Sequence, residues 1–347
     1  MRIARPVGAG VVLGFVLIAV AGVFPVGGEA RAADDFIEGQ YWALIIGIDK
    51  YPAFPDDMQL VSARKDAEAV AMLLRDRYGF AKEQMIELYD EAATRKGIIK
   101  ALAQLKRQLT AQDSLVVYFS GQGGYEAKKG RGDEIGYWLP FDAERPEDTA
   151  AAVFNNQFRD FFANYPVRHI FLVSDSVFSS SLMGKTVTLL RTRDAAKELY
   201  RDKSRWVLMS GGNYPVADPA DKNKKGHSVF AWHLLKALEA NTKPYLLGAD
   251  VVEIIAPKVS NEKQGTLPRS APIIGAGDEG GQFVFRLLPQ YQKSRGAADA
   301  DKAKAAAKEN ARLEAEKAKV DAAQKELEEL ELQLKQAEEA LKKGKKP

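Results

Sequence analysis

The 347-residue chain contains no cysteine and only three histidines, and both shortages limit its chemistry. Without cysteine there are no disulfides, no cysteine-ligated zinc or iron–sulfur sites and no catalytic thiol. The three histidines, His169, His227 and His233, are scattered without the spacing of a metal site. A glycine-rich match to a dinucleotide-binding loop, residues 275–280, precedes a strand pattern instead of opening a helix. We therefore expect neither a metal nor another cofactor.

An excess of charge of one sign is also missing. The 50 lysines and arginines nearly balance the 47 aspartates and glutamates, which leaves a net charge of +3. That excess is too small to argue for a nucleic-acid partner or an anionic membrane surface. A hydrophobic content of 46% with 28% charged residues is ordinary for a soluble globular protein.

The first 32 residues have the pattern of a secretory signal peptide. Arg2 and Arg5 precede an apolar run over residues 7–26, and the small-x-small sequence at residues 30–32 fits a cleavage site. We expect export to a bacterial periplasm or to the outside of the cell, with Ala33 as the mature start. The alternative is an uncleaved inner-membrane anchor, since a spanning helix needs about 20 apolar residues. The protein would contact a membrane only in that case.

Between residues 40 and 291, short apolar runs alternate with helical patterns. The predicted strands are 42–48, 84–90, 113–121, 168–176, 205–212 and 280–289, and the predicted helices are 60–80, 94–109, 155–165, 227–240 and 249–259. Thr94 and Ser228 are expected to cap two of these helices. Alternating strands and helices with right-handed crossovers predict an α/β fold, a three-layer αβα sandwich around a mainly parallel central sheet.

Residues 297–345 change to a composition of alanine, lysine and glutamate with a heptad pattern. Apolar residues recur every seven positions, and a second set follows three residues after some of them: Leu313, Val320, Leu327, Leu334 and Leu341, then Ala323, Leu330 and Ala337. Glu316 interrupts this seam. The pattern predicts a C-terminal coiled coil, with self-association or hetero-association through residues 306–341. A single solvated helix held by glutamate–lysine pairs is the alternative.

Three predicted strands end in conspicuous loops, "GIDKY" (47–51), "YFSGQGG" (118–124) and "SDSVFSSS" (174–181). In a parallel sheet, function collects at the carboxyl ends of the strands. The order of these motifs resembles the caspase-like domain of caspases and metacaspases, in which the later two strands end in Phe-Ser-Gly-His-Gly and Asp-x-Cys-x-Ser-Gly. The resemblance covers residues 41–240 and implies a p20-like half at about 40–180 and a p10-like half at about 205–291.

The same resemblance exposes a matched loss at the catalytic positions. Gln122 stands where the family has its histidine, and Val177 stands where the family has its cysteine nucleophile. Valine offers no nucleophile, and glutamine does not titrate in a useful pH range. The resemblance therefore implies an inactive family member, whose function is peptide or protein binding, scaffolding or regulation of a true peptidase.

Other parts of the implied peptide site are present. Gly121 and Gly123 match glycines whose amides face the pocket in the family, and Asp175 matches a position that helps to bind a basic side chain. Ser120 and Ser176 adjoin these positions and complete the candidate peptide-binding set. The resemblance thus implies a protein or peptide partner with basic residues. For Asp175 the alternative is a structural carboxylate that caps a neighbouring helix or pairs with a surface lysine.

Two other functions follow from different features of the sequence. A hydrolase is conceivable if one of the serines at 176–181 acts as the nucleophile, but that serine needs a base within reach. We expect His169 at the opposite end of its strand and His227 at the start of a helix. The second alternative is a structural protein, in which the globular domain is a passive head and the coiled coil is the working part.

Overall fold

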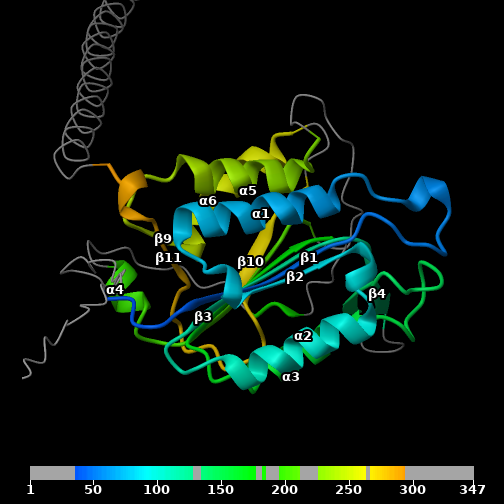
Figure 1. The fold of residues 1–347 in the computed structure, drawn as a ribbon, viewed down its shortest axis with the longest axis horizontal. Helices are drawn as coiled ribbons and strands as arrows, with labels where there is room; N and C mark the ends of the chain where they lie inside the picture. Colours follow the sequence, from blue (N-terminus) through cyan, green and yellow to red (C-terminus); the bar gives the residue numbers. More distant parts are fainter. Residues whose placement is uncertain are drawn as a thin grey trace, which may run out of the picture. The chain divides into compact units, whose positions relative to one another are not determined.

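The computed structural model describes residues 36–127, 134–176, 182–184, 195–211, 226–262 and 266–293 (Figure 1). The predicted signal peptide, the predicted coiled coil at 297–345 and the position of Val177 lie outside these ranges. Within them, none of the helices is both long and apolar enough to cross a bilayer.

A central sheet of six strands forms the middle layer. In spatial order its strands are β10 (Arg269–Pro272), β8 (Ser204–Met209), β7 (His169–Asp175), β3 (Ser114–Ser120), β1 (Tyr41–Gly47) and β2 (Met85–Tyr89). The five strands from β8 to β2 run parallel, and β10 joins the β8 edge antiparallel. Every residue of β3, β7 and β8 is buried. Burial of both faces explains why these strands read as nearly continuous apolar runs.

Helices cover both faces of this sheet. Figure 1 shows α1 (Ala63–Tyr78), α5 (Val229–Ala240) and α6 (Gly248–Ser260) on one face, and α2 (Arg95–Gln108) and α3 (Asn155–Ala163) on the other. On the second face, strand residues such as Leu44 and Val117 share one core with Leu102 of α2 and Phe158 of α3. The predicted three-layer sandwich with a mainly parallel sheet is therefore confirmed.

The predicted helix starts are confirmed by their caps. The Thr94 side chain accepts a hydrogen bond from the Gly97 amide at the start of α2, and the Ser228 side chain accepts one from the Ala231 amide at the start of α5. Each bond satisfies an amide that has no partner within its own helix. A short helix, α4 (Ala195–Leu199), lies between β7 and β8 in the sequence.

Most of the short strands outside the central sheet were not predicted; β11 is the exception. An antiparallel sheet contains β4 (Gly123–Ala127), β5 (Glu134–Trp138) and β6 (Val153–Phe154), and a two-stranded sheet pairs β9 (Tyr245–Leu247) with β11 (Val284–Arg286). The predicted strand at 280–289 is therefore shorter than expected and lies outside the central sheet. Strands of two to five residues are too short for a clear alternation of apolar and polar residues.

Candidate functional site at the carboxyl ends of the strands

The three predicted loops meet at one edge of the central sheet. In the strand register, Gly47 of β1 lies opposite Ser120 of β3, and Ser120 lies opposite Asp175 of β7. Ser120 and Asp175 are both buried, with 3% and 4% of their surfaces exposed. The structure therefore brings the motif residues at 118–124 and 174–176 together, as expected for parallel strands.

Gln122 uses its side chain to hold the loop that follows β1. Its Nε2 atom donates a hydrogen bond to the Met58 carbonyl at 2.9 Å, and its backbone amide donates to the Tyr51 hydroxyl at 2.7 Å. The Leu139 amide donates to the Gln122 carbonyl at 3.0 Å. Burial, the largest cause, raises the pKa of Tyr51, which therefore stays protonated and donates to the Leu139 carbonyl. Gln122 thus links the loop after β3 to the loop after β1 through hydrogen bonds.

The glycines on either side of Gln122 differ in their surroundings. A Cβ atom at Gly121 would lie 2.8 Å from the Tyr51 hydroxyl and 2.9 Å from Phe119 Cζ, so no larger residue fits without movement. Gly123 begins β4, where it lies opposite Trp138. Gly121 is therefore required by the close approach of Tyr51, whereas Gly123 belongs to the first position of an antiparallel strand.

Asp175 contacts the start of α5. Its Oδ2 atom accepts a hydrogen bond of 2.6 Å from the Ser228 hydroxyl, and that hydroxyl also accepts from the Ala231 amide at 3.0 Å. The alternative function considered for Asp175, contact with a helix cap, therefore has a direct structural counterpart. A buried carboxylate is nevertheless a strong partner for a cation that reaches it, because the surrounding dielectric is low.

A second carboxylate, Asp66 of α1, shares the same helix start. Asp66 is fully buried; its Oδ1 atom lies 2.6 Å from His227 Nδ1, and its Oδ2 atom accepts from the Ser228 amide at 3.1 Å. Burial, the largest cause, raises the pKa of Asp66, while His227 and Ser228 act in the opposite direction. Asp66 is not among the candidate site residues predicted from the sequence. Its place on the apolar face of α1, one turn before Val70, is the signal that marks it as buried.

The Tyr118 hydroxyl lies near both carboxylates. Burial raises the pKa of Tyr118, and the negative charges of Asp175 and Asp66 raise it further. Its hydroxyl is buried, and a hydrogen bond with Ser120 acts in the opposite direction on this pKa. Two acidic side chains and one phenol therefore gather at the start of α5, at the edge of the sheet where the motif loops meet.

The serines and histidines do not form a hydrolytic arrangement in the described residues. Ser176 is buried and forms a 2.9 Å hydrogen bond with Ser174, which also accepts from Trp138 Nε1 at 3.0 Å. His169 lies at the start of β7, at the opposite end of the strand, as expected. His227 faces Asp66. Within these ranges, no three or more acidic and histidine side chains are placed to hold a metal ion.

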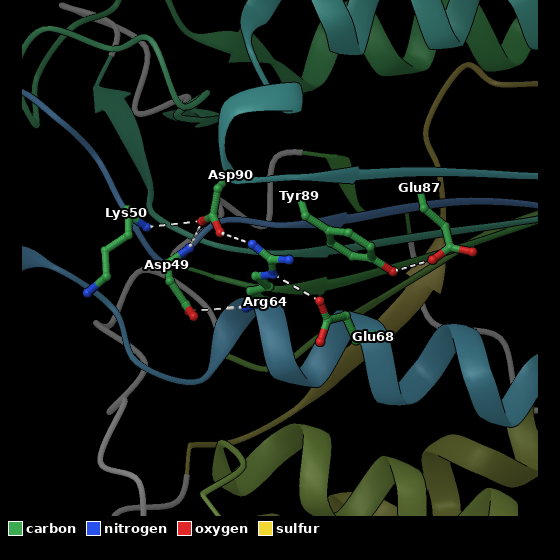
Figure 2. Close-up of polar contacts among 7 residues, drawn as sticks. All are labelled: Asp49, Lys50, Arg64, Glu68, Glu87, Tyr89 and Asp90. Atoms are coloured by element: carbon green, nitrogen blue, oxygen red, sulfur yellow. Dashed lines mark hydrogen bonds and ion pairs between the residues drawn. The ribbon is translucent and has the colours of Figure 1, made fainter.

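A polar network fixes the loop after β1 to the end of β2 (Figure 2). Asp90 has a φ of 40°, and its Oδ1 atom accepts from the amides of Asp49 (2.8 Å) and Lys50 (3.2 Å). Its Oδ2 atom lies 3.0 Å from Arg64 Nη1, and Arg64 also pairs with Glu68. The "GIDKY" loop therefore supplies backbone donors to a structural carboxylate, which holds the start of α1 against the sheet.

The sequence is similar to a known protein family. A profile of the caspase domain, peptidase family C14, matches residues 40–268. Metacaspase-1A of Neurospora crassa is 27% identical over 194 residues, which are 52% of this chain and 41% of that protein. Metacaspase-7 of Arabidopsis thaliana is 31% identical over 151 residues, 41% of this chain and 35% of that protein.

A shorter alignment links the chain to Metacaspase-1B of Aspergillus fumigatus, at 32% identity over 105 residues, 28% of this chain and 25% of that protein. The chain spans less than half the length of each of these three relatives. The family profile, by contrast, matches most of the described strands and helices, from β1 to α6. The chain belongs to the caspase-domain family and is related to metacaspases.

Proposed function

We propose that this caspase-domain protein binds peptides without cleaving them. The observation that carries the proposal is the absence of any cysteine in the chain, together with a glutamine at the family's histidine position. The hydrogen bond from Gln122 Nε2 to the Met58 carbonyl supports it, because a carboxamide does not ionise near neutral pH and so cannot replace histidine as a general acid or base. The site would keep its loops and lose its reaction.

The ligand class that fits this site is a peptide with arginine or lysine. Asp175 lies beside Ser120 at the end of the central strands, and Asp66 lies close by at the start of the same helix, α5. Two carboxylates held in a buried setting attract a guanidinium or ammonium group. Binding of such a peptide, or of a basic segment of a partner protein, would suit a scaffold or a regulator of an active peptidase.

We also propose where the protein is located and how it assembles. The signal-like segment at 1–32 supports export to the periplasm or the cell exterior, with an inner-membrane anchor as the alternative. The heptads at 306–341 support association with a second coiled-coil segment, on this chain or on a partner. The globular domain would then present its peptide site from an oligomer.

The catalytic half of the proposal is tested with fluorogenic peptides that carry arginine or lysine before the scissile bond. The mature chain is expected to give no turnover above the blank. Turnover that disappears in the Gln122→Ala variant would contradict the proposal. A fluorophosphonate probe provides a second check: labelling of a serine within residues 176–181 would instead support a serine hydrolase.

The binding half is tested by fluorescence anisotropy with a labelled arginine peptide and its citrulline counterpart, which has the same shape without the charge. Asp175→Asn is expected to weaken arginine binding by about tenfold or more, since a charge-assisted hydrogen bond contributes about 1.5–3 kcal/mol. Asp160→Asn is the matched control, because Asp160 is exposed on α3 and pairs with Arg159. Equal affinity for both peptides would contradict a cation site.

A further inference from the structure

Two adjacent residues supply hydrogen-bond donors to both buried carboxylates of the site. His227 faces Asp66 at 2.6 Å, and Ser228 donates its amide to Asp66 and its hydroxyl to Asp175. Asp66 is fully buried, and Asp175 is 4% exposed. His227 and Ser228, which precede α5, therefore already contact the carboxylate oxygens that a cationic ligand would need to reach.

This arrangement sets a condition on ligand binding. A guanidinium group cannot contact a carboxylate that solvent itself does not reach, so donors must move aside before a ligand enters. His227 is the part of this arrangement nearest to solvent, with 11% of its side chain exposed. Gly226 precedes it with a φ of 76°, a conformation that glycine adopts without strain. The turn 226–228 can thus change its backbone angles at Gly226 more easily than within α5.

We infer that His227 and Ser228 are specificity-determining residues, which compete with the cationic side chain of a ligand for Asp66 and Asp175. This inference rests on the proposed binding of basic peptides. An arginine carries five N–H donors in a planar fork, enough to replace the imidazole donor at Asp66 and the hydroxyl donor at Asp175. A citrulline or norleucine side chain lacks the charge and gains little from the exchange.

The Tyr118 hydroxyl supports a ligand at this position. It is buried close to the two carboxylates and to Ser120. A hydroxyl oxygen has two acceptor lone pairs, so a donor-rich ligand that bridges the carboxylates can also donate to it. The exchange of the internal donors for a ligand would therefore place the ligand beside a further polar group.

A ligand that displaces the Ser228 hydroxyl from Asp175 also affects the start of α5. Its hydroxyl donates to Asp175 and at the same time accepts from the Ala231 amide as the helix cap. His227 does not have this second role; its ring stacks near Trp232 with centroids 6.3 Å apart. Substitution of His227 therefore removes a competitor while the cap of α5 stays in place, which makes His227 the better position for a test.

The experiment measures the affinity of the full mature chain for the arginine peptide and the citrulline peptide by anisotropy. His227→Ala is expected to bind the arginine peptide about 5- to 20-fold more tightly, because the ligand no longer has to displace the imidazole, and to bind the citrulline peptide as before. His227→Leu is the second variant, because leucine keeps most of the packing beside Trp232 without any donor. Adding Asp66→Asn to His227→Ala should abolish the gain.

A second measurement follows the imidazole directly. The chain has only three histidines, so a ¹⁵N-labelled sample gives few ring signals. The arginine peptide is expected to shift the His227 signals while the buried His169 signals, at the far end of β7, stay unchanged. If the His227 signals no longer shift in Asp175→Asn, the peptide that displaces the imidazole also contacts Asp175.

The outcomes separate this inference from the proposed function. If the wild-type chain binds the arginine peptide selectively but neither His227 variant binds it more tightly, competition by His227 is wrong and the proposed function stands. If no variant prefers arginine over citrulline, both are wrong. Binding that appears only in the His227 variants supports competition by His227 and contradicts the proposed binding of basic peptides by the wild-type chain.

Discussion

Gln122 lies at the carboxyl end of β3, beside the other motif loops, as the sequence pattern predicts. Its contact with the Met58 carbonyl was not predictable, because the two residues are 64 positions apart. The loop that carries Met58 is folded by Gln59, whose Nε2 donates to the carbonyls of Tyr51 and Phe54. The position of Gln122 thus follows from local pattern, and its role depends on how a distant loop is folded.

His169 provides a pH-dependent prediction at the residue scale. Its Nε2 atom lies 3.0 Å from the Tyr200 carbonyl, which can only accept, so Nε2 carries the proton and Nδ1 accepts from the Ser204 hydroxyl at 3.1 Å. Burial, the largest cause, lowers the pKa of His169 from 6.5 to about 3. Between these values the unfolded chain binds more protons than the folded chain, so stability falls as the pH falls.

We expect the free energy of unfolding to decrease from pH 6.5 towards pH 3, with a contribution from His169 of at most about 1.4 kcal/mol per pH unit. Urea unfolding at several pH values measures this slope. His169→Gln, which keeps one donor and one acceptor, should flatten the slope in that window. His233→Gln controls for the loss of a histidine as such. An unchanged slope in His169→Gln would contradict the assignment.

At the scale of elements, the short strands show what sequence patterns miss. The long, buried strands β3 and β7 were predicted within a residue or two, whereas β4, β5 and β10 were not. β10 contains only four residues and ends in Pro272, and its place is decided by pairing with β8 along the sheet edge. Long elements carry their own periodicity, but short ones depend on the partner strand.

The buried Arg205 links three elements and gives a stability prediction. Its guanidinium donates to the carbonyls of Tyr165, Val167 and Arg168, in the connection between α3 and β7. Burial, the largest cause, lowers the pKa of Arg205 to about 10, so it stays charged near neutral pH. Arg205→Met leaves several buried carbonyls without a donor and is expected to cost about 3 kcal/mol or more, measured by urea unfolding.

A surface arginine on α3 serves as the control for this substitution. Arg159 has 41% of its side chain exposed and pairs with Asp160 on the surface of α3. Arg159→Met should change the free energy of unfolding by less than about 0.5 kcal/mol. Similar small losses for both variants would show that the carbonyls around Arg205 find other donors.

At the scale of the whole molecule, we predict that the C-terminal segment drives self-association. The mature chain from Ala33 should sediment as a dimer or larger species at micromolar concentration, and a chain that ends at Lys293 should sediment as a monomer. A helix this polar buries little by itself, so it gains stability from a partner helix. Analytical ultracentrifugation distinguishes the two states.

Variants within the heptads separate the seam from the rest of the segment. Leu327→Lys with Leu334→Lys places two charges in the predicted seam and should give a monomer. Glu329→Lys with Gln336→Lys adds lysines outside the seam and should leave the assembly intact. A full-length chain that already sediments as a monomer would refute self-association and leave a different partner for the heptads.

Much of this protein was determined by the sequence alone. The alternation of apolar runs and helical patterns specifies the three-layer fold, since each long element must bury its apolar face, and the end motifs of β3 and β7 identify the caspase-domain family. The absence of cysteine and the presence of Gln122 and Val177 at the positions predicted for the family's catalytic pair are equally visible in the sequence. Only the tertiary structure showed that Asp66 and Asp175 share donors from His227 and Ser228, because these hydrogen bonds join residues 53 to 162 positions apart.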